Sequence, residues 1–147
     1  MILESNAVLQ IQKPIEEVFE GIVNPAKMCK YFISESNGRL DAGKDLLWKF
    51  PEFPDYYPIT NIKVVKPQSI SFVWDPDTVV NITLESLEDK STLVRVNEKG
   101  KEMNEENLKW VIENSGGWAN FLACIKAYLE YGIELRNGAF DFMKKAT

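Results

Sequence analysis

The sequence has 147 residues, of which 45% are hydrophobic and 27% are charged, a composition typical of an ordinary globular domain. We therefore expect residues 1–147 to form one domain. Histidine is absent, which excludes Ser–His and Cys–His nucleophile pairs and histidine-based zinc sites. The formal net charge of −5 and the scattered basic residues argue against a nucleic-acid partner.

The N-terminus and the cysteines indicate the cellular compartment of the protein. The first residues, Met1 to Asn6, lack the basic region and the long apolar run of a secretory signal. No segment approaches the roughly 18 apolar residues of a membrane span. Cys29 and Cys124 lie in helix-like apolar patterns, which predicts two reduced, buried thiols. We expect a cytoplasmic protein.

The N-terminal part of the chain predicts a strand and two short helices. Alternating aliphatic residues indicate a strand over residues 7–12. Pro14 suits the first turn of a helix, and apolar residues recur at helical spacing over residues 15–22. Asn24-Pro25 ends this helix and begins the second one.

The middle of the chain predicts an antiparallel sheet. Apolar and polar residues alternate in five short runs, at residues 46–50, 62–64, 70–74, 80–84 and 94–96. Turn-forming residues separate these runs. Alternation gives the sheet one apolar face, which another element must cover.

The C-terminal part predicts the helix that covers this face. Asn104 is a suitable N-cap, and a long apolar stripe begins at Trp118. Gly116-Gly117 costs roughly 2 kcal/mol of helix propensity against two alanines, so we expect a kink or break there. Gly132 should allow close approach to the sheet, and Asn137-Gly138 should end the helix.

Several motifs together resemble a known family. They are Pro14-Ile15-Glu16-Glu17-Val18-Phe19, Asn24-Pro25, Ile70-x-Phe72-x-Trp74, Thr92-x-Val94-x-Val96-x-Glu98-x-Gly100, Gly117-Trp118-Ala119-Asn120-Phe121-Leu122 and Tyr128-Leu129-Glu130-Tyr131-Gly132. In order and spacing they resemble the activator of heat-shock-protein-90 ATPase homologue-1-like family (the Aha1 C-terminal-domain type), within the START-like SRPBCC superfamily.

The resemblance implies an α+β helix-grip fold. In this fold a curved antiparallel sheet wraps around a long C-terminal helix, two short helices follow the first strand, and a cavity lies between sheet and helix. Residues 51–58 form a longer connection than in many relatives. Because three prolines and three aromatic residues stiffen it, we expect a lid over the mouth of the cavity.

The candidate ligand-binding residues are those expected to face the cavity. They are Trp48, Phe50, Phe53, Tyr57, Phe72, Trp74, Glu98, Trp118 and Leu122. Glu98 shares a strand face with Val94 and Val96, so alternation directs its carboxylate inward as a polar anchor and directs Arg95 outward. In the alternative interpretation the aromatic residues only fill the core, and Glu98 reaches solvent at the strand end.

Three classes of function stay open. We favour the binding of a hydrophobic or amphipathic small molecule in the cavity. The family name suggests a co-chaperone-like protein-interaction domain with a chaperone partner. A cavity enzyme of cyclase or hydrolase type would use Glu98 or a loop tyrosine as acid or base. We assign no catalytic residue, cofactor or metal site, because the acidic pairs lie at helix starts and turns. A homodimer stays open.

Overall fold

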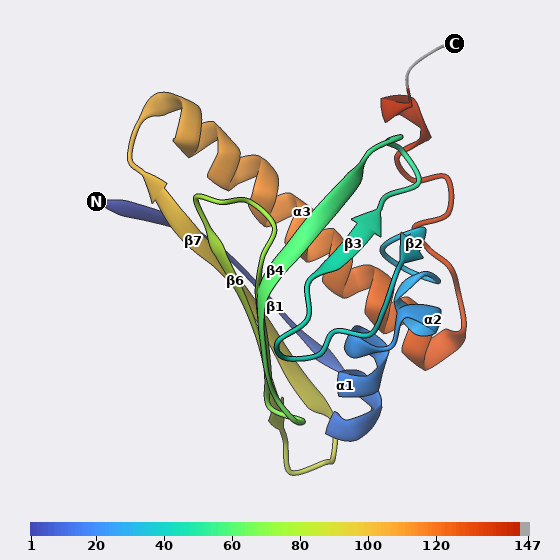
Figure 1. The fold of residues 1–147 in the computed structure, drawn as a ribbon. Coiled ribbons are helices and arrows are strands. Elements are labelled where there is room, and N and C mark those ends of the chain that lie inside the picture. Colours follow the sequence, from blue (N-terminus) through green and yellow to red (C-terminus); the bar gives the residue numbers. More distant parts are fainter. Residues whose placement is uncertain (145–147) are drawn as a thin grey trace.

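The computed structural model describes residues 1–144, in which seven strands form one antiparallel sheet (Figure 1). The strands are β1 (Ile2–Ile11), β2 (Glu35–Ser36), β3 (Leu46–Lys49), β4 (Tyr56–Val65), β5 (Ser69–Val73), β6 (Val79–Ser86) and β7 (Thr92–Glu102). Their order in the sheet is β1-β7-β6-β5-β4-β3-β2. The helices are α1 (Ile15–Val23), α2 (Pro25–Met28), the long α3 (Glu105–Tyr131) and the 3-10 turn η1 (Asp141–Met143).

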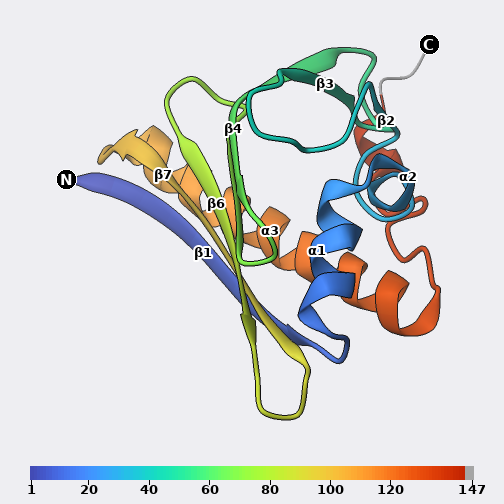
Figure 2. The same ribbon diagram turned by 60° about the horizontal axis from the view of Figure 1, so that its bottom comes forward.

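The sheet curves, and α1 and α3 lie on its concave side (Figure 2). This arrangement, with two short helices after the first strand, is the helix-grip fold that the resemblance implied. Within residues 1–144, no helix has the length and apolar character needed to cross a membrane.

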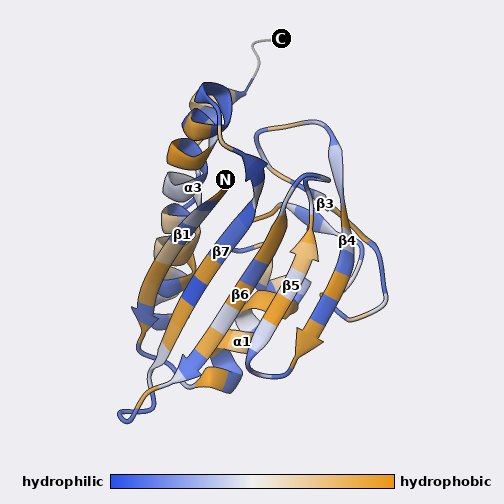
Figure 3. Cartoon of the chain, turned by 90° about the vertical axis from the view of Figure 1, so that its left-hand side faces the viewer, coloured by the Kyte–Doolittle hydropathy of each residue, from blue (hydrophilic) through white to orange (hydrophobic). Residues whose placement is uncertain are grey.

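The period of two along the strands decides which side chains are buried. In β7, Val94, Val96 and Glu98 are buried, whereas Arg95 is exposed and pairs with Glu85 across the outer face. Figure 3 shows the alternation of hydrophobic and hydrophilic residues along the strands. The outward direction of Arg95 is therefore confirmed, and of the two interpretations left open for Glu98 the structure supports the inward one.

The predicted break at Gly116-Gly117 is wrong, because α3 runs uninterrupted from Glu105 to Tyr131. Both glycines are exposed, while Trp118 just after them is buried. The packing of the residues around the glycines against the sheet offsets their low helix propensity. The predicted cap is confirmed, since the Asn104 side chain accepts a hydrogen bond from the Asn107 N–H.

The helix ends at Gly132, six positions before the predicted end at Gly138. Gly132 adopts a left-handed conformation with φ 67° and caps the helix. The predicted close approach to the sheet is also wrong, because a Cβ at this position would meet no atom within 4 Å.

The predicted loop over residues 51–58 is shorter than expected, because β4 already begins at Tyr56. Pro58 lies opposite Leu47 in the β3–β4 ladder. The Leu47 N–H donates a hydrogen bond to Asn37 Oδ1, and the Leu47 carbonyl accepts one from the Asn37 N–H. Both backbone groups of Leu47 therefore point away from β4. The missing N–H of Pro58 therefore costs the ladder nothing.

Candidate functional site

A groove of about 630 Å³ opens at one end of the sheet, where four segments meet. They are the β3–β4 hairpin, the residues that follow β5, the first half of α3 and the C-terminal segment (residues 133–144). The lining residues are Phe50, Glu52, Phe53, Tyr57, Trp74, Asp75, Trp110, Asn114, Arg136, Phe140 and Met143. This volume and mainly aromatic lining are typical of sites for small molecules.

A smaller pocket of about 130 Å³ adjoins the groove. The two share the lining residues Trp74, Asn114, Arg136 and Phe140, and the smaller one extends to Trp118 and Phe121. The larger space therefore lies at the end of the helix–sheet interface, and only the smaller one lies beside Trp118.

The buried Glu98 carboxylate accepts four hydrogen bonds. Oε1 accepts from Trp118 Nε1 at 2.9 Å and from Asn114 Nδ2 at 3.0 Å. Oε2 accepts from Trp74 Nε1 at 2.9 Å and from Thr78 Oγ1 at 2.7 Å. Glu98 is 1% exposed, so the alternative in which it reaches solvent is wrong. With two bonds at each oxygen, protein donors occupy its acceptor capacity.

These hydrogen bonds orient a pair of stacked indoles. The rings of Trp74 and Trp118 have centroids 5.1 Å apart and planes inclined by 23°. Phe32 packs edge-on against Phe121 and Phe50, at 4.8 Å and 5.2 Å between centroids. Because both indole N–H groups point at Glu98, the indoles present apolar ring surface elsewhere.

Asn114, which lines both the groove and the adjoining pocket, has an unused hydrogen-bond acceptor. Its Nδ2 donates to Ser5 Oγ at 2.5 Å and to Glu98 Oε1 at 3.0 Å, which uses both amide hydrogens and sets the orientation of the amide. In the part of the chain that the structure describes, its Oδ1 accepts no hydrogen bond and is not buried. It is therefore free to accept one from a ligand.

An ion pair connects two walls of the groove. Arg136 Nη1 and Nη2 donate to Glu52 Oε1 and Oε2 at 2.8 Å and 3.2 Å. The Arg136 and Glu52 side chains are only 13% and 4% exposed. The guanidinium carbon also lies 5.8 Å from the centre of the Phe50 ring and 5.0 Å from that of Phe140. The pair thus ties the C-terminal segment to the β3–β4 hairpin.

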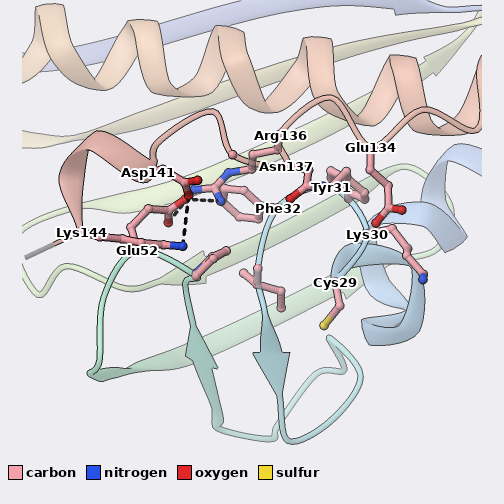
Figure 4. A pocket seen from close by; sticks show the side chains of 13 residues that line it. Cys29, Lys30, Tyr31, Phe32, Glu52, Glu134, Arg136, Asn137, Asp141 and Lys144 are labelled. Atoms are coloured by element: carbon pink, nitrogen blue, oxygen red, sulfur yellow. Dashed lines mark hydrogen bonds and ion pairs between the residues drawn. The ribbon is translucent and has the colours of Figure 1, made fainter.

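A third pocket, of about 220 Å³, lies beside this ion pair and is mostly polar (Figure 4). Its charged lining residues are Lys30, Glu52, Glu134, Arg136, Asp141 and Lys144. Burial, together with the nearby Glu35 carboxylate, raises the pKa of the Cys29 thiol. Burial also raises the pKa of Tyr31 well above its usual value, and its hydroxyl donates to the Gly21 carbonyl at 2.8 Å. Neither group is therefore activated as a nucleophile.

Residues 1–144 contain no cluster of three or more His, Cys, Asp or Glu side chains able to hold a metal ion.

The structure separates the predicted ligand-binding residues into three groups. Phe50, Phe53, Tyr57 and Trp74 line the groove, and Trp118 lines the adjoining pocket. Trp48, Phe72 and Leu122 are buried in the core and are not among the lining residues of either space. Glu98 lies behind the indoles that it orients. Contact of any of these residues with a ligand stays a prediction.

The sequence analysis missed several lining residues. They are Glu52, Asp75, Trp110, Asn114, Arg136, Phe140 and Met143. A signal for two of them was present, because Trp110, Asn114 and Trp118 recur every four residues and so share one helix face. No periodic signal covers Arg136 and Phe140, which follow the end of the helix.

Comparison with known proteins gives consistent matches. The family model for Activator of Hsp90 ATPase homolog 1-like protein matches residues 12–130. The structure of SSP2350 from Staphylococcus saprophyticus is similar with a TM-score of 0.81 at 30% identity, over 91% of this chain and 96% of that chain.

Two further structures are similar at lower identity, which shows the fold alone. The Aha1 dimer from Colwellia psychrerythraea has a TM-score of 0.75 at 17% identity, over 88% of this chain and 98% of that chain. Protein BH1534 from Bacillus halodurans has a TM-score of 0.75 at 19% identity, over 87% and 97%. No match was found among curated proteins.

Proposed function

The chain belongs to the Activator of Hsp90 ATPase homolog 1-like protein family, and from its START-like fold we propose that it binds a hydrophobic or amphipathic small molecule. The observation that carries this proposal is the groove of about 630 Å³, whose aromatic walls come from four separate segments. Such a concave, mainly apolar surface with few polar groups is the usual form of a small-molecule site.

In this proposal the apolar part of the ligand packs against the side chains of Phe50, Phe53, Tyr57 and Trp74. Its polar group donates a hydrogen bond to Asn114 Oδ1. We assign Glu98 the role of a positioning residue, because its carboxylate oxygens already accept four hydrogen bonds from protein donors. Trp118 supports Trp74 from behind, and Trp48, Phe72 and Leu122 support the site from the core.

The test uses N-phenyl-1-naphthylamine, an uncharged dye whose fluorescence rises in apolar surroundings. We expect saturable binding with one dye per chain. Tyr57→Ala removes one aromatic wall, and the loss of roughly 1 kcal/mol of apolar contact weakens binding about fivefold. Ile112→Ala is the control, since Ile112 is 69% exposed and does not line the groove. Absence of saturable binding, or equal affinity in Tyr57→Ala and the control, would contradict the proposal.

Native mass spectrometry of freshly purified protein complements the dye. A retained small molecule would give a discrete mass increment that disappears on denaturation. Its loss from Tyr57→Ala, with retention by Ile112→Ala, is expected for a ligand held in the groove.

A further inference from the structure

Each charged side chain that lines the groove has an opposite charge beside it. Among the residues that the structure describes, the charged lining residues are Glu52, Asp75 and Arg136. Glu52 pairs with Arg136 through two parallel hydrogen bonds. Asp75 Oδ2 lies 3.0 Å from Lys101 Nζ, whose side chain is 15% exposed. The charges of the lining are thereby neutralised within the protein.

The Glu52–Arg136 pair matters most for a ligand, because Arg136 lines the groove, the adjoining pocket and the polar pocket. A two-pronged guanidinium is the side chain best suited to bind a carboxylate, sulfonate or phosphate. Here Glu52 occupies that fork from inside the protein. A ligand that brings its own acidic group must compete with Glu52 or lose hydration without gaining a cation.

Glu98 also disfavours an anionic ligand in the groove. Its carboxylate lies at the N–H edges of Trp74 and Trp118 and does not line the groove, and all of its hydrogen-bond donors are uncharged groups. Its negative charge is therefore spread over four hydrogen bonds but is not cancelled by a cation among these partners. An anion in the groove would experience this charge through the indoles, where screening by water is weak.

We propose that the groove selects uncharged amphiphiles against anionic ones, and that Glu52 determines this selectivity. By neutralising Arg136, Glu52 removes the cation that would otherwise recruit an acidic head group. The inference rests on the proposed binding function and adds the charge class of the ligand. The Asn114 Oδ1 acceptor fits this class, because it bonds to a hydroxyl, amine or amide donor and repels an anion.

Two dyes with one framework test the proposal. N-phenyl-1-naphthylamine is uncharged, and 8-anilino-1-naphthalenesulfonate adds a sulfonate to the same anilinonaphthalene skeleton. We measure the ratio of the two affinities, sulfonate over uncharged, in the parent protein and in variants. The parent is expected to bind the uncharged dye at least about tenfold more tightly. In Glu52→Gln the released guanidinium gains a charge-assisted hydrogen bond to the sulfonate, which raises the ratio about tenfold or more.

A matched control and an opposite variant complete the design. Glu85→Gln makes the same change in a carboxylate that also pairs with an arginine, Arg95, but on the exposed outer face, so its ratio should equal that of the parent. Arg136→Gln leaves the Glu52 carboxylate without its cation, so the ratio should fall about fivefold. Circular dichroism and thermal melting verify that each variant is folded.

The outcomes separate this inference from the proposed function. If neither dye binds the parent in a saturable manner, the proposed function fails and the inference fails with it. If both dyes bind but the parent does not prefer the uncharged one, or a folded Glu52→Gln keeps the parental ratio, the charge selectivity is refuted and the binding function stands. If Glu52→Gln does not fold, Arg136→Gln decides, and an unchanged ratio in that variant overturns the inference.

Discussion

Replacing Glu98 by glutamine tests whether the buried carboxylate holds the site together. The change keeps the size of the side chain and replaces one acceptor oxygen by an amide NH₂ group. Turned one way, its NH₂ group faces Trp118 Nε1 and Asn114 Nδ2, which can only donate. Turned the other way, it faces Trp74 Nε1, which can only donate, and the Thr78 hydroxyl, which can rotate and accept. The second orientation is therefore preferred, and in it the Trp74 hydrogen bond is lost while the Thr78 one reverses its direction.

The cost follows from which donors lose their acceptor. Oε1 accepts from the buried Trp118 and the half-buried Asn114. Oε2 accepts from the buried Thr78 and the half-buried Trp74. The preferred orientation leaves the half-buried Trp74 N–H without its acceptor, and each of the three remaining hydrogen bonds is weakened by roughly 1 kcal/mol because its partner is no longer charged. We expect a total loss of about 2–4 kcal/mol, a large fraction of the 5–15 kcal/mol typical of a domain.

Urea unfolding followed by tryptophan fluorescence measures this loss. Near-ultraviolet circular dichroism should also change, because Trp74 and Trp118 stack at 5.1 Å and Trp74 loses its acceptor. Glu85→Gln, which removes only an exposed ion pair, should stay within about 0.5 kcal/mol of the parent. A Glu98→Gln protein as stable as this control, with an unchanged near-ultraviolet spectrum, would refute the reasoning.

Three further predictions concern stability. Leu122→Ala should cost about 2–5 kcal/mol, because Leu122 is 1% exposed in the core, and a urea midpoint equal to that of the parent would show that its burial contributes little. Gly100→Ala should cost about 2 kcal/mol or more, since Gly100 has φ +145° and a Cβ there would lie 2.0 Å from the Asp77 carbonyl oxygen; unchanged urea unfolding would contradict this strain. The hydrogen bonds from Arg39 lower the pKa of Glu20 from 4.5 to about 2, so the stability due to this pair is present above pH 4.5 and is lost as the pH falls towards 2. Arg39→Gln should therefore lower the free energy of unfolding at pH 7 by at most about 1 kcal/mol, because the pair is one-third exposed, and should have a clearly smaller effect at pH 2, where about half of the Glu20 carboxyl groups are protonated; an equal effect at both pH values would argue against this linkage.

The parts of the fold that local chemistry decides could be predicted from the sequence. Asn24 and Asn104 cap the helices that follow them, and the period of two gives the buried face of β7. The uninterrupted helix at Gly116-Gly117 could not be predicted, because propensity describes an isolated helix and the packing of its neighbours decides here. The continuation of β4 through Pro58 also depends on tertiary structure. Leu47, which lies opposite Pro58, forms its backbone hydrogen bonds with Asn37 and needs none from Pro58.

The lining of the groove was predictable only for its strand and hairpin residues, for a related reason. Aromatic residues in an alternating run can be recognised from the sequence, as Trp74 can at the end of residues 70–74. Arg136 lies in an aperiodic segment, and its partner Glu52 is 84 positions away. A buried ion pair of this kind depends on where the chain returns after the helix, which no local pattern encodes.

Glu98 shows most clearly where inference from sequence ends. Alternation correctly directs its carboxylate inward, because strand geometry is local. Whether an inward carboxylate binds a ligand depends on how many donors the rest of the fold brings to it. Here the connection between β5 and β6 brings Trp74 and Thr78, and α3 brings Asn114 and Trp118. In the proposed function the carboxylate thus serves the scaffold, and the acceptor left for a ligand is the Oδ1 atom of Asn114, whose amide Glu98 holds in place.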